Sequence, residues 1–219
     1  MNLENYNIGA GLNKKVYVEL IKILDSLDKK QTIRILEFGS GMSTKFFIDY
    51  NNLHKSNTEI TSFDNDLNWC YKQKPEDTCL NLHIRPLITC DESDFNAQIK
   101  NKTFNRDSFS AVNTGPAWRQ RNCFYDIQED DIKGEYDIIV IDGPSGNGRN
   151  ISYFHFMKNV KPGTIVLIDD HNASDGAFNY DFIDHFNHFF NAEEVHRYES
   201  PLLGNFQDGG NFVLLRIKS

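Results

Sequence analysis

A glutamate and two glycines stand close together near the start of the chain, at the end of a short apolar run. The glutamate is Glu37, and Gly39 and Gly41 come after it with Ser40 between them. Glycines permit a tight turn from a strand into a helix, and without a side chain they let a ligand approach the backbone closely. The spacing therefore predicts a ligand-binding turn that continues through Ser43 into a helix.

The charge beside this turn limits which ligand it can hold. A nicotinamide dinucleotide site prefers a third glycine at the position of Thr44, and it places a pyrophosphate on the helix N-terminus. Glu37 would repel that pyrophosphate, whereas its carboxylate suits an ammonium group. The turn therefore favours the amine-bearing methionine end of S-adenosylmethionine.

A second acidic residue follows the next apolar run. This run covers residues 60–63 and ends at Asp64, 23 positions after Gly41. An acidic residue at the end of the second strand can accept hydrogen bonds from both hydroxyls of a ribose. A Gly-x-Gly turn alone is a weak signal, because ordinary strand-to-helix turns share it. Together with Glu37 and Asp64 the turn predicts a nucleoside-containing cofactor.

Three carboxylates and a histidine follow two later apolar runs. Asp142 ends one run, and Asp169, Asp170 and His171 follow the other. Because the carboxyl ends of parallel strands meet at one edge of a sheet, we expect an acceptor to bind there. Carboxylates from neighbouring strand ends can ligate Mg²⁺ or another divalent cation, and Asp142 or His171 can act as the base. The alternative is that the paired aspartates cap a loop and that the histidine is solvated.

These residues need a framework of alternating strands and helices. We expect helices at residues 14–27, 43–51, 151–160 and around Phe182, Phe186 and Phe189, and strands at 33–37, 60–63, 80–87, 136–142, 164–168, 194–197 and 211–217. The alternation predicts a mainly parallel sheet with helices on both faces. Residues 143–150 are expected to form a glycine-rich loop and residues 161–163 a turn. Residues 89–122 have no sustained period, which predicts an insertion that folds over a ligand.

Composition favours one α/β domain over the 219 residues. Hydrophobic residues make up 39% of the chain, and the net charge of −8 argues against nucleic acid as a partner. The four cysteines have neither the spacing of a zinc site nor that of a secreted disulfide framework. No run approaches the roughly 18 to 20 apolar residues of a membrane span. We therefore expect a cytoplasmic protein that does not bind membranes; its oligomeric state stays open.

The order of the motifs resembles the class I S-adenosylmethionine-dependent methyltransferases, in particular the small-molecule and sugar O-methyltransferases of polysaccharide and antibiotic pathways. The matching segments are Leu36-Glu37-Phe38-Gly39-Ser40-Gly41, Ser62-Phe63-Asp64, residues 137–144, Lys161-Pro162-Gly163 with residues 166–170, and Gly209-Gly210-Asn211-Phe212-Val213. The resemblance implies a Rossmann-like α/β fold whose seven-stranded sheet is mainly parallel with an antiparallel last strand.

The resemblance also implies roles for individual residues. Glu37 and the backbone at residues 39–41 would hold the methionine part, Asp64 the ribose, and Tyr125 with its neighbours would lie near the adenine. Metal-dependent catechol and macrolide-sugar O-methyltransferases carry their ligands where this chain has Asp142, Asp169 and Asp170. The catechol type has a lysine three residues after the first carboxylate. This chain has Ser145 there.

The expected function is transfer of a methyl group from S-adenosylmethionine to a small acceptor, such as the hydroxyl of a carbohydrate. Two other functions fit the same residues: an aminopropyltransferase that uses decarboxylated S-adenosylmethionine, and a noncatalytic binding protein that retains the fold. A dinucleotide oxidoreductase is disfavoured by Glu37 and Thr44.

Overall fold

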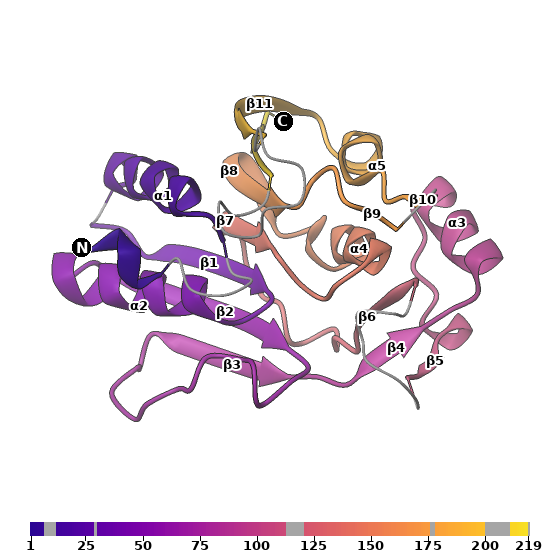
Figure 1. Ribbon diagram of the computed structural model, residues 1–219, viewed down its shortest axis with the longest axis horizontal. Helices are drawn as coiled ribbons and strands as arrows, with labels where there is room; N and C mark the ends of the chain where they lie inside the picture. Colours follow the sequence, from indigo (N-terminus) through magenta and orange to yellow (C-terminus); the bar gives the residue numbers. More distant parts are fainter. Residues whose placement is uncertain (7–11, 29, 113–120, 176–177, 200–210, 219) are drawn as a thin grey trace.

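A seven-stranded sheet forms the centre of the protein (Figure 1). The computed structural model describes residues 1–6, 12–28, 30–112, 121–175, 178–199 and 211–218. Along the sheet the strands are β11 (Ala192–Tyr198), β12 (Phe212–Ile217), β8 (Val160–Asp169), β7 (Tyr136–Ile141), β1 (Ile33–Phe38), β2 (Thr58–Asp64) and β3 (Leu80–Ile84). β12 runs antiparallel to both of its neighbours, and the other pairs in this sheet are parallel. The predicted α/β fold with an antiparallel last strand is confirmed.

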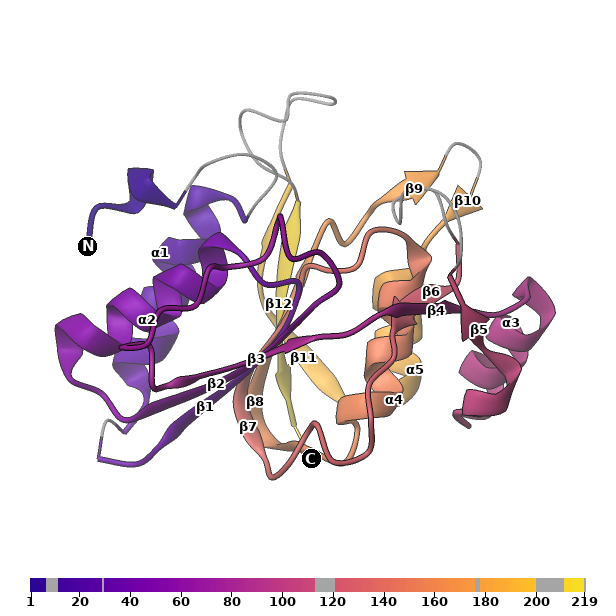
Figure 2. The same ribbon diagram turned by 90° about the horizontal axis from the view of Figure 1, so that it is seen from below.

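Helices cover both faces of this sheet, as Figures 1 and 2 show. α1 (Lys14–Ser26) and α2 (Met42–His54) lie on one face, and α4 (Ser152–Phe156) and α5 (Phe182–Phe189) on the other. Alternate strand residues point to opposite faces, so Ile35 packs with the α1 and α2 cluster and Leu36 with the α4 and α5 cluster. No helix within the described parts of the chain has the length and hydropathy needed to span a membrane.

The predicted third strand divides into two. β3 joins the large sheet, whereas β4 (Leu87–Thr89) joins a separate three-stranded sheet with β5 (Ser110–Ala111) and β6 (Cys123–Tyr125). Pro86 separates β3 from β4, and proline has no N–H to donate to a neighbouring strand. The alternation at residues 80–87 therefore predicted the extended backbone correctly and its continuity wrongly.

The predicted insertion at residues 89–122 contains regular structure. α3 (Glu92–Asn101) lies beyond the small sheet in Figure 2 and buries Phe95, Gln98 and Ile99. These positions share one face of a helix, but two apolar residues gave too weak a periodic signal for a helix to be predicted. Residues 113–120 of the predicted insertion lie outside the described residues.

Two boundaries between β7 and β8 also differ from the sequence prediction. The helix expected at residues 151–160 is a 3₁₀ turn, η4 (Asn147–Ile151), followed by α4, which ends at Phe156. The expected turn at residues 161–163 lies within β8, where Gly163 has a φ of 94° and the pairing with β7 shifts register. Glycine adopts this left-handed backbone conformation readily, so the strand continues through an irregularity instead of ending.

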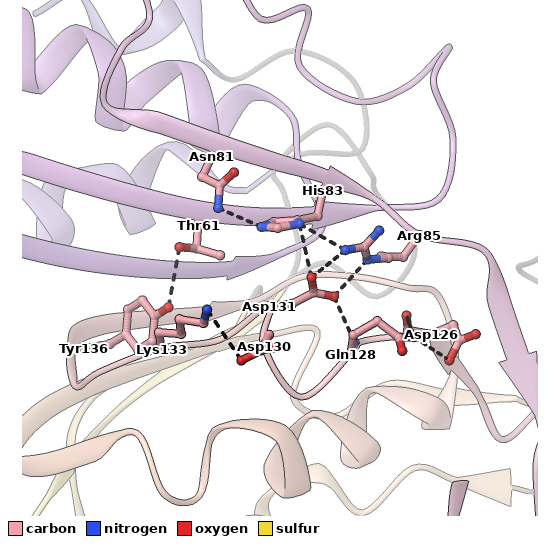
Figure 3. A network of polar contacts seen from close by, with 10 residues as sticks. All are labelled: Thr61, Asn81, His83, Arg85, Asp126, Gln128, Asp130, Asp131, Lys133 and Tyr136. Carbon is pink, nitrogen blue, oxygen red and sulfur yellow. Dashed lines mark hydrogen bonds and ion pairs between the residues drawn. The ribbon is translucent and has the colours of Figure 1, made fainter. Parts of the chain in front are cut away.

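The segment that contains Asp131 packs beside the end of β3 and forms an ion pair with Arg85, as Figure 3 shows. Arg85 donates from Nε to Asp131 Oδ2 at 2.9 Å, and Tyr136 and Thr61 approach at 3.4 Å between their hydroxyl oxygens. A cavity of about 380 Å³ opens here, and several of its charged side chains already have partners, such as Arg34 with Glu59 at 3.1 Å. It lies along the first halves of β1, β2 and β3, away from the strand ends that carry the predicted site.

Candidate cofactor and acceptor site

The two glycines of the predicted turn play different structural roles. Gly39 has a φ of 101°, and a Cβ placed on it would lie 2.7 Å from the backbone nitrogen of Gly143. A Cβ on Gly41 would meet nothing within 4 Å. Gly39 therefore permits close packing of the loops that follow β1 and β7, whereas Gly41 leaves open space in front of the backbone.

Asp64 holds the glycine turn against the end of β2. Its Oδ2 accepts a hydrogen bond from the backbone N–H of Ser40 at 3.0 Å, and its Oδ1 accepts from the N–H groups of Asn65 and Asp66 at 2.7 and 2.8 Å. Burial raises the pKa of Asp64, and the three backbone hydrogen bonds oppose that shift. The structure thus places Asp64 beside the turn, and its contact with a ribose stays a prediction.

Glu37 is a fully buried carboxylate with one unpaired oxygen. Its Oε2 accepts hydrogen bonds from Thr44 and Ser62, at 2.5 and 2.6 Å. Its Oε1 has no hydrogen-bond partner among the described residues. Burial raises the pKa of Glu37 to about 7, against hydrogen bonds from Ser43, Ser62 and Thr44 that lower it.

These contacts explain the threonine at the position where a dinucleotide site has glycine. Thr44 Oγ1 also accepts from the N–H of Gly41 at 2.9 Å and lies 3.0 Å from Ser40 Oγ. Thr44 thus joins the turn to Glu37. The free Oε1 of Glu37 and the open space at Gly41 fit a ligand that brings an ammonium group.

The strand-end carboxylates gather around a buried arginine. Arg149 is 6% exposed and donates hydrogen bonds to the carbonyl oxygens of Pro144 and Asp169, at 2.9 and 3.0 Å. Its guanidinium nitrogens lie 3.9 Å from carboxylate oxygens of Asp142 and of Asp170. From the sequence, Arg149 has two interpretations, contact with an anionic acceptor and an ordinary exposed loop arginine. Its position in the loop after Asp142 was the available signal, but a sequence does not say that a loop arginine points inward.

Asp142 and Asp169 form a hydrogen-bonded pair of carboxyl groups, of which Asp169 is buried and Asp142 half-buried. Burial raises the pKa of both, and the Arg149 charge opposes the rise. The hydrogen bond between them favours a proton on Asp169 and a carboxylate on Asp142. Asp169 Oδ1 has no hydrogen-bond partner in the described part of the chain. Protonation of Asp169 is therefore favoured over protonation of Asp142 beside the guanidinium.

The prediction of a metal site on Asp142, Asp169 and Asp170 is not supported by this arrangement. Within the described residues, no group of three or more histidine, cysteine, aspartate or glutamate side chains could hold a metal ion. The prediction assumed that only a cation or a proton could relieve the repulsion between these carboxylates. Arg149 supplies positive charge at that place, and the Asp142–Asp169 hydrogen bond favours the neutral form of Asp169.

His171 and Tyr125 occupy different surroundings from each other. His171 is buried, and the charges that act on its pKa after burial are those of Arg197, Glu199 and Glu194, in and after β11. His171 is therefore not a solvated loop residue, and its base role stays a prediction.

Tyr125, on β6, is fully buried, and a Cβ on Gly143 would lie 2.4 Å from its hydroxyl oxygen. Its hydroxyl thus lies beside the glycine turn.

Comparison with solved structures identifies proteins of similar fold. Precorrin-6y C5,15-methyltransferase from Geobacter metallireducens is 12% identical, with a TM-score of 0.50 over 94% of this chain and 89% of that one. The CurJ carbon methyltransferase is 13% identical, with a TM-score of 0.51 over 95% of this chain and 54% of that one. No family model matches the sequence, and no curated protein matches it. This chain therefore has an α/β fold similar to that of these two methyltransferases.

Proposed function

We propose that this protein is an S-adenosylmethionine-dependent methyltransferase. The observation that carries the proposal is the unpaired Oε1 of buried Glu37 beside the open backbone at Gly41. A buried carboxylate oxygen without a partner is unfavourable, and a ligand ammonium group would satisfy it. The similarity in fold to two methyltransferases supports the same conclusion.

The chain's own residues bind and orient the cofactor in this proposal. Glu37 accepts hydrogen bonds from the methionine ammonium, and the backbone at Gly41 lies against the methionine part. Asp64 holds the ribose, and Tyr125 lies toward the adenine. The bound cofactor supplies a methyl group on a positively charged sulfur. Rate then depends mainly on holding an acceptor atom about 3 Å from that methyl carbon, in line with the bond that breaks.

The acceptor in this proposal is a small molecule with a hydroxyl group, such as a carbohydrate. Asp142 follows β7 at the edge where an acceptor would approach, and its carboxylate takes the proton that the hydroxyl loses. The Arg149 charge opposes the rise in the pKa of Asp142 that burial causes, and so favours the ionised carboxylate. His171 is the other candidate base, and assistance by a divalent cation is the alternative that chelation tests.

A direct experiment separates the three functions. The purified protein is incubated in parallel with methyl-labelled S-adenosylmethionine and with decarboxylated S-adenosylmethionine, each with a panel of monosaccharides, nucleotide sugars, phenols and polyamines, and both products are measured. A methyltransferase forms S-adenosylhomocysteine and labelled acceptor in equal amounts. An aminopropyltransferase forms methylthioadenosine from decarboxylated S-adenosylmethionine, and a noncatalytic protein binds ligand without forming either. Absence of S-adenosylhomocysteine binding would refute the cofactor assignment itself.

The cellular setting remains part of the proposal. The acidic composition and the cysteine spacing support a cytoplasmic enzyme that acts on neither nucleic acid nor membranes.

A further inference from the structure

The hydroxyl of Tyr17 is buried without a hydrogen-bond partner. Tyr17 lies in α1 and is 0% exposed. Its ring packs against Tyr6 and Phe46, with ring centroids 5.6 and 4.9 Å away. Packing therefore accounts for the aromatic ring. It does not account for the hydroxyl, which has no partner within the described chain.

Other tyrosines on this side of the sheet have partners for their hydroxyls. Tyr6 donates to Asp49 at 2.6 Å, and Tyr50 donates to Asp25 at 2.7 Å. Buried tyrosine hydroxyls in proteins usually find such a partner. Tyr17 departs from this rule although phenylalanine would fill the same space, which indicates that the hydroxyl meets a group that is not part of the chain.

The sheet directs the predicted cofactor residues toward the helix that carries Tyr17. Ile35 of β1 and Leu167 of β8 pack in the same cluster as Tyr17. Side chains two residues apart in a strand share a face, so Glu37 and Asp169 point to this face as well. Burial raises the pKa of Tyr17, and the negative charges of Asp142 and Glu37 raise it further.

Three buried polar atoms that have no partner among the described residues therefore share one face at the carboxyl edge of the sheet. They are Tyr17 Oη, Glu37 Oε1 and Asp169 Oδ1, from α1, β1 and β8. When it is ionised, Glu37 accepts hydrogen bonds but donates none, whereas the tyrosine hydroxyl can also donate one. A ligand that satisfies both must carry a donor and an acceptor close together, as the ammonium and carboxylate of an amino acid do.

We propose that Tyr17 is a cofactor-positioning residue, whose hydroxyl donates to the carboxylate of the methionine end while Glu37 accepts from its ammonium. This inference rests on the proposed function and adds a residue from α1 to the site. Without a donor nearby, the carboxylates beside Tyr17 would only repel the ligand carboxylate. A donating tyrosine hydroxyl at this place offsets that repulsion, which explains its position. It also predicts that Tyr17 recognises the amino-acid part of the cofactor and not its nucleoside.

The test compares two ligands and two variants by calorimetry. S-adenosylhomocysteine carries the amino-acid group, whereas methylthioadenosine lacks it and keeps the nucleoside. Y17F removes the unpaired hydroxyl, and Y50F is the matched control because it removes a buried hydroxyl that already has a partner. We expect Y17F to bind S-adenosylhomocysteine roughly tenfold more weakly, with unchanged affinity for methylthioadenosine, and Y50F to change neither.

The outcomes separate this inference from the proposed function. Equal affinity of wild type and Y17F for S-adenosylhomocysteine would overturn the role of Tyr17 alone, as would equal losses for both ligands. If wild type does not bind S-adenosylhomocysteine, the proposed function is overturned together with this inference. Should Y17F not fold, hydrogen exchange of wild type decides: α1 must be protected more by S-adenosylhomocysteine than by methylthioadenosine, and equal protection refutes the proposal.

Discussion

Binding of S-adenosylhomocysteine should depend on pH through Glu37. The ligand-free pKa of this buried carboxyl is about 7, compared with 4.5 for an ordinary glutamate. The difference of 2.5 units corresponds to about 3 kcal/mol, by which burial disfavours the ionised form. A ligand ammonium group on Oε1 favours that form, so the bound state should hold Glu37 ionised.

The sign of the effect follows from the raised pKa. Well above pH 7 Glu37 is already ionised, and binding releases no proton from it. Below pH 7 the ligand must displace a proton, and affinity falls by about tenfold for each pH unit. Between pH 7.5 and pH 5.5 the dissociation constant should therefore rise about 25-fold, as the protonated fraction dictates.

Calorimetry at both pH values, in buffers of different ionisation enthalpy, measures the affinity and the number of protons released. Wild type should release about one proton at pH 5.5 and a fraction of one at pH 7.5. E37Q keeps the side-chain shape but cannot ionise, so its affinity should be weaker at pH 7.5 and nearly constant across the range. Ionisation of the ligand and of other groups affects both proteins, and the difference between them isolates Glu37. A pH profile that is the same for wild type and E37Q would refute this reasoning.

Three further predictions follow from single residues. Gly41→Ala should fold normally and bind S-adenosylhomocysteine more weakly, because its Cβ would enter the open space at the turn. Gly39→Ala should lower the unfolding midpoint, because its Cβ would lie 2.7 Å from Gly143 N at a φ of 101°. Equal effects of the two substitutions on unfolding would contradict this distinction. Burial lowers the pKa of His155 from 6.5 to about 4, so the unfolded state takes up a proton below pH 6.5 that the folded state refuses until about pH 4. The free energy of unfolding should therefore fall by about 2 kcal/mol at pH 5 relative to pH 7.5 because of His155. In urea unfolding, His155→Phe should lack that part of the loss. Methyl transfer should survive exhaustive chelation, because Arg149 stands beside the carboxylates; activity that disappears and returns on adding Mg²⁺ would restore the metal mechanism.

The sequence by itself determined the elements whose signals are local. The apolar runs that became β1, β2, β7 and β8 are bounded by acidic residues or glycine, so the strands and the ends that carry the site were readable along the chain. The glycine turn was readable for the same reason, since a tight strand-to-helix turn limits which residues can occupy it. Parallel order then brought Glu37, Asp64 and Asp142 to one edge of the sheet.

Tertiary structure decided which side chains complete that edge. Arg149 turns inward to two carbonyl oxygens, and Tyr17 reaches the same face from a helix that precedes β1. Neither position follows from spacing, because a side chain's partners at long sequence separation depend on how helices pack on the sheet. The same limit explains α3, whose few apolar residues become a buried face only against the small sheet. Local patterns thus fixed the strand ends and the turn, whereas the charge balance between the strands arose from packing.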